Sequence, residues 1–169
     1  MVPGNGGLGM ELINSMDLDS ELSVVLRLII AFALGAWIGF DREKHGSSAG
    51  IRTYAAVCLG ATLYTAIGEH MGDTAAASRI IANILVGIGF LGAGIIYKND
   101  KTGNSQGLTT AATVWCTAGI GVAVGLKMLI IAVVAAAAVY FLLSLHHHKW
   151  YLRWKTKMQK EHKIENPDD

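Results

Sequence analysis

Charged side chains occur at a few positions inside long apolar stretches, where each one needs a partner or a route to water. Arg27 comes five residues after the first stretch begins at Leu22, and Glu69 and Asp73 stand at the end of the second. Because an ionised side chain at the bilayer centre costs about 2.5–3.5 kcal/mol or more, such residues are paired or reach the interface. We therefore expect Arg27 either to extend outward to the interface or to pair with Glu69 or Asp73.

The remaining polar residues of these stretches favour structural roles over catalysis. Arg79 and Asn83 are four residues apart, so they share one helix face, and the Asn83 amide predicts an interhelical hydrogen bond. Ser, Cys and His residues form no nucleophile–base pattern, so no enzyme activity is expected. Glu69 and Asp73 are weak candidates for a metal site, because they make no clear Mg²⁺ ligand set. We expect no cofactor and leave Mg²⁺ binding open.

The elements that must position these residues are apolar stretches of membrane-spanning length. Hydrophobic residues make up 52% of the 169, and charged residues 16%, against roughly 25% in soluble proteins. A span needs about 20 apolar residues, and four stretches cover residues 22–40, 51–71, 79–97 and 108–145. The last is too long for one span, and its break is marked by Gly119, Gly121, Gly125 and Lys127. The sequence therefore predicts an all-α integral membrane bundle of five transmembrane helices.

Basic residues set the orientation of this bundle, because cytoplasmic loops carry an excess of Lys and Arg. With the N-terminus outside, eleven basic residues fall on the inner side, against Arg79 and Lys127 on the outer side. We therefore predict an extramembrane N-terminal tail over residues 1–21, a membrane domain over 22–145 and a basic cytoplasmic tail over 146–169. The expected location is the inner (cytoplasmic) membrane of a bacterium.

Glycines of the first and third spans stand at spacings that suit helix packing. Residues 87–94 read GIGFLGAG, which contains the letters of a dinucleotide-binding fingerprint. That fingerprint needs a preceding strand and a soluble parallel sheet, neither of which fits a transmembrane stretch. Small residues instead allow close packing of helices in lipid. The residues expected in helix packing are Gly35, Gly39, Gly87, Gly89, Gly92 and Gly94. A homodimer face is an open alternative, and no nucleic-acid partner is expected.

Four motifs occur in a fixed order along the chain: Arg42-Glu43, AGIRT at residues 49–53, GIGFLGAG at 87–94, and GLTTAAT at 107–113 followed by Trp115. This pattern resembles the membrane domain of the MgtC/SapB family of bacterial inner-membrane proteins, without the soluble C-terminal domain of its virulence-type members. The resemblance implies a link to growth at low magnesium, virulence or acid tolerance. In the best-known members this link runs through inhibition of the membrane ATP synthase.

The predicted topology places all four motifs in the cytoplasmic half of the bundle. We hypothesise a polar vestibule or partner-docking surface there, formed by Asp41, Arg42, Glu43, Arg52, Thr53, Thr109 and Thr110. The alternative is that these residues are positive-inside anchors and helix caps.

Two functions follow from these expectations. A regulatory or interaction protein, linked to magnesium limitation, acid or other stress, would contact another membrane complex such as an ATP synthase. It predicts grooves of small residues between helices and no continuous polar path. The alternative is a transporter or channel for magnesium or another ion, which predicts polar residues aligned across the membrane.

Overall fold

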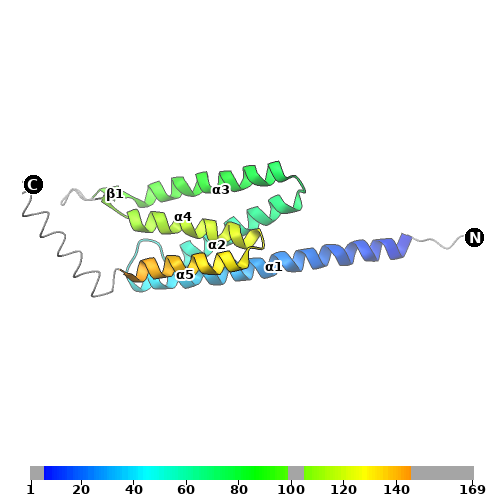
Figure 1. The fold of residues 1–169 in the computed structure, drawn as a ribbon, viewed down its shortest axis with the longest axis horizontal. Coiled ribbons are helices and arrows are strands. Elements are labelled where there is room, and N and C mark those ends of the chain that lie inside the picture. The colour runs from blue at the N-terminus through cyan, green and yellow to red at the C-terminus, as the bar shows by residue number, and fades with distance from the viewer. Residues whose placement is uncertain (1–5, 99–104, 146–169) are drawn as a thin grey trace, which may run out of the picture.

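The computed structural model describes residues 6–98 and 105–145 of the chain. Within these ranges the fold consists of five helices and one short hairpin, as the order of elements shows (Figure 1). The prediction of an all-helical bundle is therefore confirmed. The predicted basic tail at 146–169 lies outside the described residues.

The first helix is longer than the sequence predicted. Helix α1 runs without a break over Gly6–Lys44, which is 39 residues, so most of the predicted tail at 1–21 is helical. No proline occurs in this range, and a helix that has formed propagates more easily than a new one starts. At 1.5 Å per residue α1 is about 58 Å long, and its N-terminal part projects beyond the other helices (Figure 1).

Helices α2 and α3 form an antiparallel pair joined by a tight turn. Helix α2 covers Ile51–His70 and α3 covers Thr74–Ile95. The Asp73 carboxylate accepts a hydrogen bond from the Ala75 amide at 2.9 Å, which caps α3. Helix α3 therefore begins five residues before the predicted start of the third span at 79.

A short antiparallel hairpin connects α3 to α4. Strand β1 is Tyr97–Lys98 and β2 is Ser105–Gln106. Helix α4 follows over Leu108–Gly125, and α5 over Leu129–Leu145. The turn between them occupies residues 126–128, and Lys127 adopts a positive φ of 62°. The predicted tight break in the long apolar stretch is thus confirmed, although Gly119 and Gly121 lie within α4.

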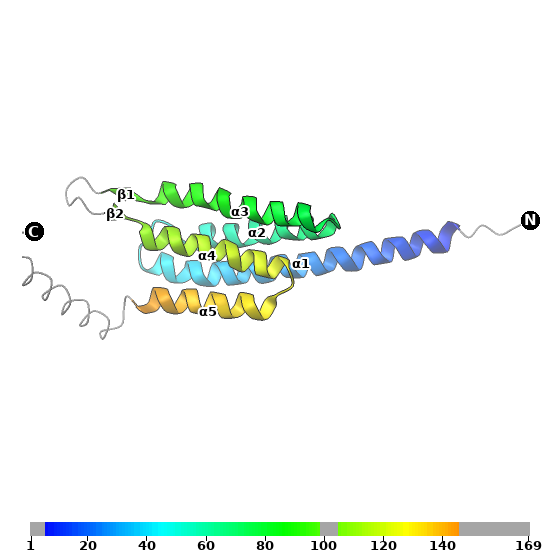
Figure 2. The same cartoon turned by 45° about the horizontal axis from the view of Figure 1, so that its top comes forward.

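Helices α1, α2 and α4 form the centre of the bundle. Helices α3 and α5 flank this centre on opposite sides (Figure 2). The largest side chains of the core include Ile38, Tyr54, Val114, Ile120 and Val124.

Glycines explain why the central helices lie so close together. A Cβ added at Gly35 would lie 2.6 Å from the Tyr54 carbonyl oxygen, and one at Gly39 would lie 2.6 Å from the Ile51 Cα. Two further glycines, Gly121 and Gly125, give α4 the same close approach to α2. The predicted packing role of Gly35 and Gly39 thus has a direct geometric basis.

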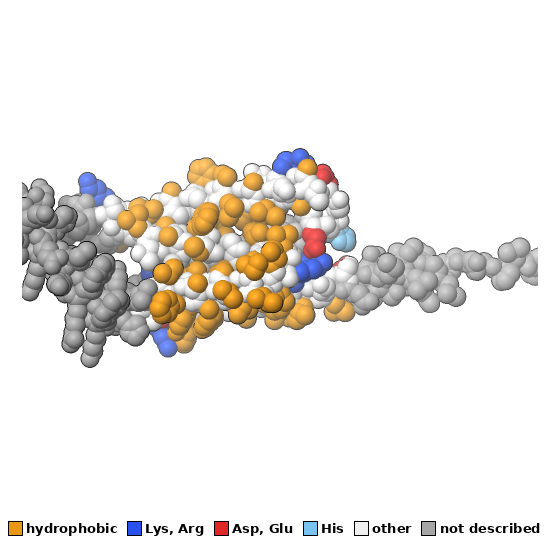
Figure 3. Space-filling view, in the orientation of Figure 1, with side chains coloured by type: hydrophobic (Ala, Val, Ile, Leu, Met, Phe, Trp, Pro, Cys, Tyr) orange, Lys and Arg blue, Asp and Glu red, His pale blue; other side chains and the backbone are white. Residues whose placement is uncertain are grey.

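The surface of the bundle suits a bilayer. Three described helices are long and apolar enough to cross a membrane, namely Ser20–Lys44, Thr74–Ile95 and Leu108–Gly125, and a shorter apolar helix covers Leu129–Ser144. In the face seen in Figure 3, hydrophobic side chains cover the middle of the bundle and charged ones lie toward its ends. The fold therefore has the apolar exterior of a membrane protein.

Candidate functional site

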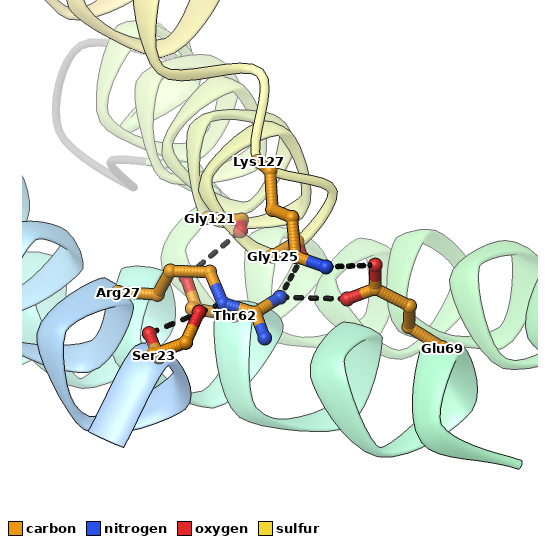
Figure 4. Close-up of polar contacts among 7 residues, drawn as sticks. All are labelled: Ser23, Arg27, Thr62, Glu69, Gly121, Gly125 and Lys127. Carbon is orange, nitrogen blue, oxygen red and sulfur yellow. Dashed lines mark hydrogen bonds and ion pairs between the residues drawn. The ribbon is translucent and has the colours of Figure 1, made fainter. Parts of the chain in front are cut away.

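One cluster of charges joins three elements at the end of the bundle from which α1 projects. We name it the Arg27 cluster, after Arg27 on α1, Glu69 on α2 and Lys127 in the α4–α5 turn (Figure 4). Arg27 Nη1 donates to Glu69 Oε2 at 2.8 Å, and Lys127 Nζ lies 2.7 Å from Glu69 Oε1. The sequence left two alternatives for Arg27, extension to the interface or pairing with Glu69 or Asp73. In the structure Arg27 pairs with Glu69.

Arg27 also completes the hydrogen bonding at the end of α4. Its Nη1 donates to the Gly125 carbonyl oxygen at 2.5 Å. The last carbonyls of a helix have no partner within the helix and carry a partial negative charge. The Arg27 side chain is only 8% exposed, whereas that of Glu69 is 37% exposed. The cluster therefore ties α1, α2 and α4 together where the Arg27 cation would otherwise be buried alone.

Asp73 does not join this cluster. Its carboxylate caps α3 and lies 3.8 Å from Arg79 on the protein surface. Glu69 is already shared by two cations. The described residues contain no group of three or more His, Cys, Asp or Glu side chains that could hold a metal ion. The two weak metal candidates of the sequence, Glu69 and Asp73, are therefore engaged in separate interactions.

A second polar cluster lies at the opposite end of the bundle. Arg42 Nη2 donates to Ser47 Oγ at 2.9 Å and to Thr110 Oγ1 at 3.2 Å, and these hydroxyls are 3.2 Å apart. We name these three residues the Arg42 cluster. It joins the end of α1, the loop that follows and the start of α4, so two of the four sequence motifs meet there through side chains.

The other residues predicted for this end make different contacts. The Glu43 carboxylate accepts from the Ile51 amide at 3.0 Å and so serves the first turn of α2. Asp41 lies against His45, at 3.6 Å between Oδ1 and Nδ1. Arg52 and Thr109 are exposed, and Thr53 lines a groove between α2 and α3. The structure therefore places all seven residues at one end, but not in one network.

A series of buried hydroxyls runs between the two clusters, and the sequence analysis missed it. Tyr54 Oη and Thr113 Oγ1 are 2.6 Å apart, and Thr62 Oγ1 donates to the Gly121 carbonyl at 2.8 Å. Thr117 Oγ1 donates to the Thr113 carbonyl at 2.8 Å. The signal was present in the sequence, because Thr110, Thr113 and Thr117 recur at helical spacing and thus share a face.

Helix α3 differs from the others, because most of its glycines pack against nothing within the chain. A Cβ added at Gly87, Gly89 or Gly94 would meet no atom within 4 Å, and one at Gly92 would touch only Ala111. The close approach expected at these glycines is therefore absent from the described residues. The physical reason is that α3 lies at the edge of the bundle, where Gly87, Gly89 and Gly94 are exposed and Gly87 borders a groove between α2 and α3.

A groove of about 650 Å³ separates α2 from α3. Its lining includes Thr53, Gly60, Tyr64, Asn83, Gly87 and Leu91. The Asn83 side chain is exposed there, and the described residues give it no hydrogen-bond partner. The interhelical hydrogen bond that the sequence predicted for Asn83 is therefore not made within this part of the chain.

Taken together, an apolar helical bundle with charges near its ends is typical of a membrane protein. The MgtC family model matches residues 28–149. This chain therefore belongs to the MgtC family, as the motifs of the sequence indicated.

Curated relatives agree with this assignment. The chain is 45% identical over 102 residues to Protein MgtC of Salmonella typhimurium strain LT2, covering 60% of this chain and 43% of the relative. It is 42% identical over 99 residues to Protein MgtC of Brucella abortus strain 2308, covering 59% and 41%. The chain thus spans less than half the length of these relatives. No solved structure matches it significantly.

Proposed function

We propose that this protein regulates another membrane complex in the bacterial inner membrane by binding to it. This regulation would serve adaptation to magnesium limitation, acid or other stress. In this proposal it acts through contacts within the bilayer and transports nothing itself. An ATP synthase is the candidate complex that the family resemblance suggests. The proposal has a topological part and a functional part, which different observations support.

Five spans, with the N-terminus outside and the C-terminus inside, are supported by the side-by-side packing of all five helices (Figure 2). Helices α2 and α5 have 20 and 17 residues, about 30 Å and 26 Å at 1.5 Å per residue, which is close to the thickness of the bilayer core. The positive-inside rule then assigns the end with the Arg42 cluster to the cytoplasm.

The closed packing of the central helices is the observation that carries the functional part. Glycines bring α2 into backbone contact with both α1 and α4. The hydroxyls between these helices are largely occupied, because Thr62, Thr113 and Thr117 each donate to a main-chain carbonyl. Such an interface favours a rigid scaffold over an aqueous pathway.

The α2–α3 groove is the surface that we propose for the partner. It is open to the membrane, and glycines beside it leave room for the backbone of another helix. Asn83 offers an unpaired amide that a polar residue of the partner helix would satisfy. A lipid tail in the groove would leave this amide unsatisfied, so a polar transmembrane helix is the more favourable occupant.

Photo-crosslinking from position 91, at the groove, tests the proposal in inner-membrane vesicles that contain the ATP synthase. Gly87→Leu fills the groove, whereas Gly119→Leu on α4 is a matched control, because both glycines are open and both changes favour a helix. We expect a specific crosslink to a synthase membrane subunit and reduced ATP-driven proton pumping. Gly87→Leu should abolish both effects and Gly119→Leu should retain them. Pumping that is unaffected by the wild-type chain would refute the ATP synthase as the partner.

Ion transport is the second candidate, and the series of buried hydroxyls favours it. This series lies between the Arg27 and Arg42 clusters, and Thr65 Oγ1 is buried there without a hydrogen-bond partner. Purified protein in liposomes with a magnesium-sensitive dye distinguishes the two candidates. Magnesium flux that Thr62→Val or Asn83→Ala abolishes would support transport and contradict the regulatory proposal.

A further inference from the structure

A polar cavity of about 300 Å³ opens beside the Arg27 cluster. Its lining includes Ser23, Arg27, Glu69, His70 and Lys127. Arg27 reaches it from α1, and Lys127 reaches it from the turn between α4 and α5 (Figure 4). The cavity therefore lies where α2 and α4 end, at the level of the lipid headgroups if these helices span the bilayer.

A larger and more apolar groove adjoins this cavity between α1 and α2. Its volume is about 670 Å³, and it shares Ser20, Val24, Ala66 and His70 with the cavity. Val25, Ile67 and Met71 extend it along the outside of the bundle, and all three are exposed. A polar cavity and an apolar groove thus form one continuous surface.

The charges at the cavity favour an anionic group. Arg27 and Lys127 bring two positive charges, and Glu69 is the single carboxylate between them. Each cation has more N–H donors than the contacts described above use, since a guanidinium has five and an ammonium three. Glu21 lies on the adjoining groove and supplies the other acidic group of this surface.

We propose that this surface binds a phospholipid, with its phosphate at Arg27 and Lys127 and one acyl chain along Val25 and Ile67. Arg and Lys are the residues that proteins use for phosphate groups, and basic pockets between transmembrane helices bind lipid headgroups. The adjoining apolar groove can hold an acyl chain, whereas a free anion would leave this groove unoccupied. The inference rests on the proposed topology, in which α2 and α4 span the bilayer, and is independent of the proposed partner.

Native mass spectrometry of the full chain, titrated with single lipids in detergent, tests this proposal. Dioleoyl phosphatidylglycerol and phosphatidylethanolamine carry the phosphate, whereas dioleoylglycerol has the same chains without it. We expect both phospholipids to bind with at least tenfold higher affinity than dioleoylglycerol. Equal affinity for all three would overturn the proposal.

Lys127→Asn removes one cation and retains a residue type that tolerates positive φ. The change should weaken phospholipid binding about fivefold, the factor expected from losing one basic residue near the headgroups. Arg79→Asn is the matched control, because Arg79 is an exposed cation outside the cavity's lining. An equal loss in both variants would indicate unspecific attraction and refute the site.

Ile67→Trp fills the apolar groove without touching the charges. It should reduce phospholipid binding, whereas Ile130→Trp, at a position 82% exposed on α5, should not. Inorganic phosphate provides the remaining comparison. If phosphate displaces the lipid at similar concentration, and if Ile67→Trp has no effect, the site binds a free anion and the lipid proposal is wrong.

Discussion

Replacing Gly35 by alanine tests whether close packing of α1 on α2 stabilises the bundle. The added Cβ would lie 2.6 Å from the Tyr54 carbonyl oxygen, 2.8 Å from the Ala55 Cα and 2.9 Å from the Cys58 Cβ. Two of these atoms belong to the backbone of α2, so they cannot turn aside. Because ordinary contacts begin at 3.4 Å, the two helices must separate by as much as 0.8 Å.

The cost of this separation can be worked from the packing. A gap of 0.5–1 Å forfeits about a quarter to a half of the dispersion energy of each affected contact, and overpacking typically costs about 1–3 kcal/mol. The gain in helix propensity from Gly to Ala returns about 1 kcal/mol at most. We therefore expect Gly35→Ala to destabilise the protein by about 1–2 kcal/mol.

Thermal unfolding of purified protein in one detergent measures this effect. Gly119→Ala is the control, because an added Cβ meets nothing within 4 Å there while the gain in propensity is the same. We expect Gly35→Ala to lower the melting midpoint by several degrees and Gly119→Ala to leave it unchanged or raised. Equal midpoints for the two variants would refute the packing argument.

Three further predictions concern hydrogen bonds. Thr62→Val removes the donor to the Gly121 carbonyl and should lower the free energy of unfolding by about 0.6–1.5 kcal/mol, measured by thermal or denaturant unfolding. An unchanged stability would show that this hydrogen bond does not contribute. Asp73→Ala removes the cap of α3, so amide exchange over the first turn of that helix should accelerate, whereas Asp73→Asn should retain most protection. Arg27→Gln should lower the free energy of unfolding by about 1–3 kcal/mol. This value is smaller than for a fully buried ion pair, because Glu69 is partly exposed and solvent screens it. A double-mutant cycle with Glu69→Gln should show coupling of at least about 0.5 kcal/mol, and additive changes would contradict the ion pair.

The sequence was sufficient to predict which segments are helices and which residues share an end of the bundle. Long apolar runs identify helices by length alone, and alternating direction then brings the Arg42 and Thr110 motifs together. The continuation of α1 through residues 6–21 was not predicted, because three glycines and several acidic residues there resemble a tail. The β1–β2 hairpin was also missed, since two-residue strands leave almost no periodic pattern.

The rotation of each helix about its axis could not be predicted. A helix that is apolar all round has no polar face to indicate which side is buried. Gly35 and Gly87 therefore look alike in the sequence, yet Gly35 contacts α2 and Gly87 faces open space. For the same reason the sequence left Arg27 two roles, extension to the interface or pairing with Glu69 or Asp73, and could not decide between them. In the structure α1 packs against α2, and Arg27 pairs with Glu69.

The uneven packing of the five helices determines which of them can move independently. Ten residues of α4 are buried, whereas in α3 Gly92 alone is. Sliding α4 past α2 would break the close contacts at Gly121 and Gly125, so the packing opposes relative motion of these two helices. Helix α3 lacks such close approaches at Gly87, Gly89 and Gly94, so displacing it would cost less packing energy than displacing α4. A change of shape in this fold would therefore cost least as a tilt of α3 against a core formed by α1, α2 and α4.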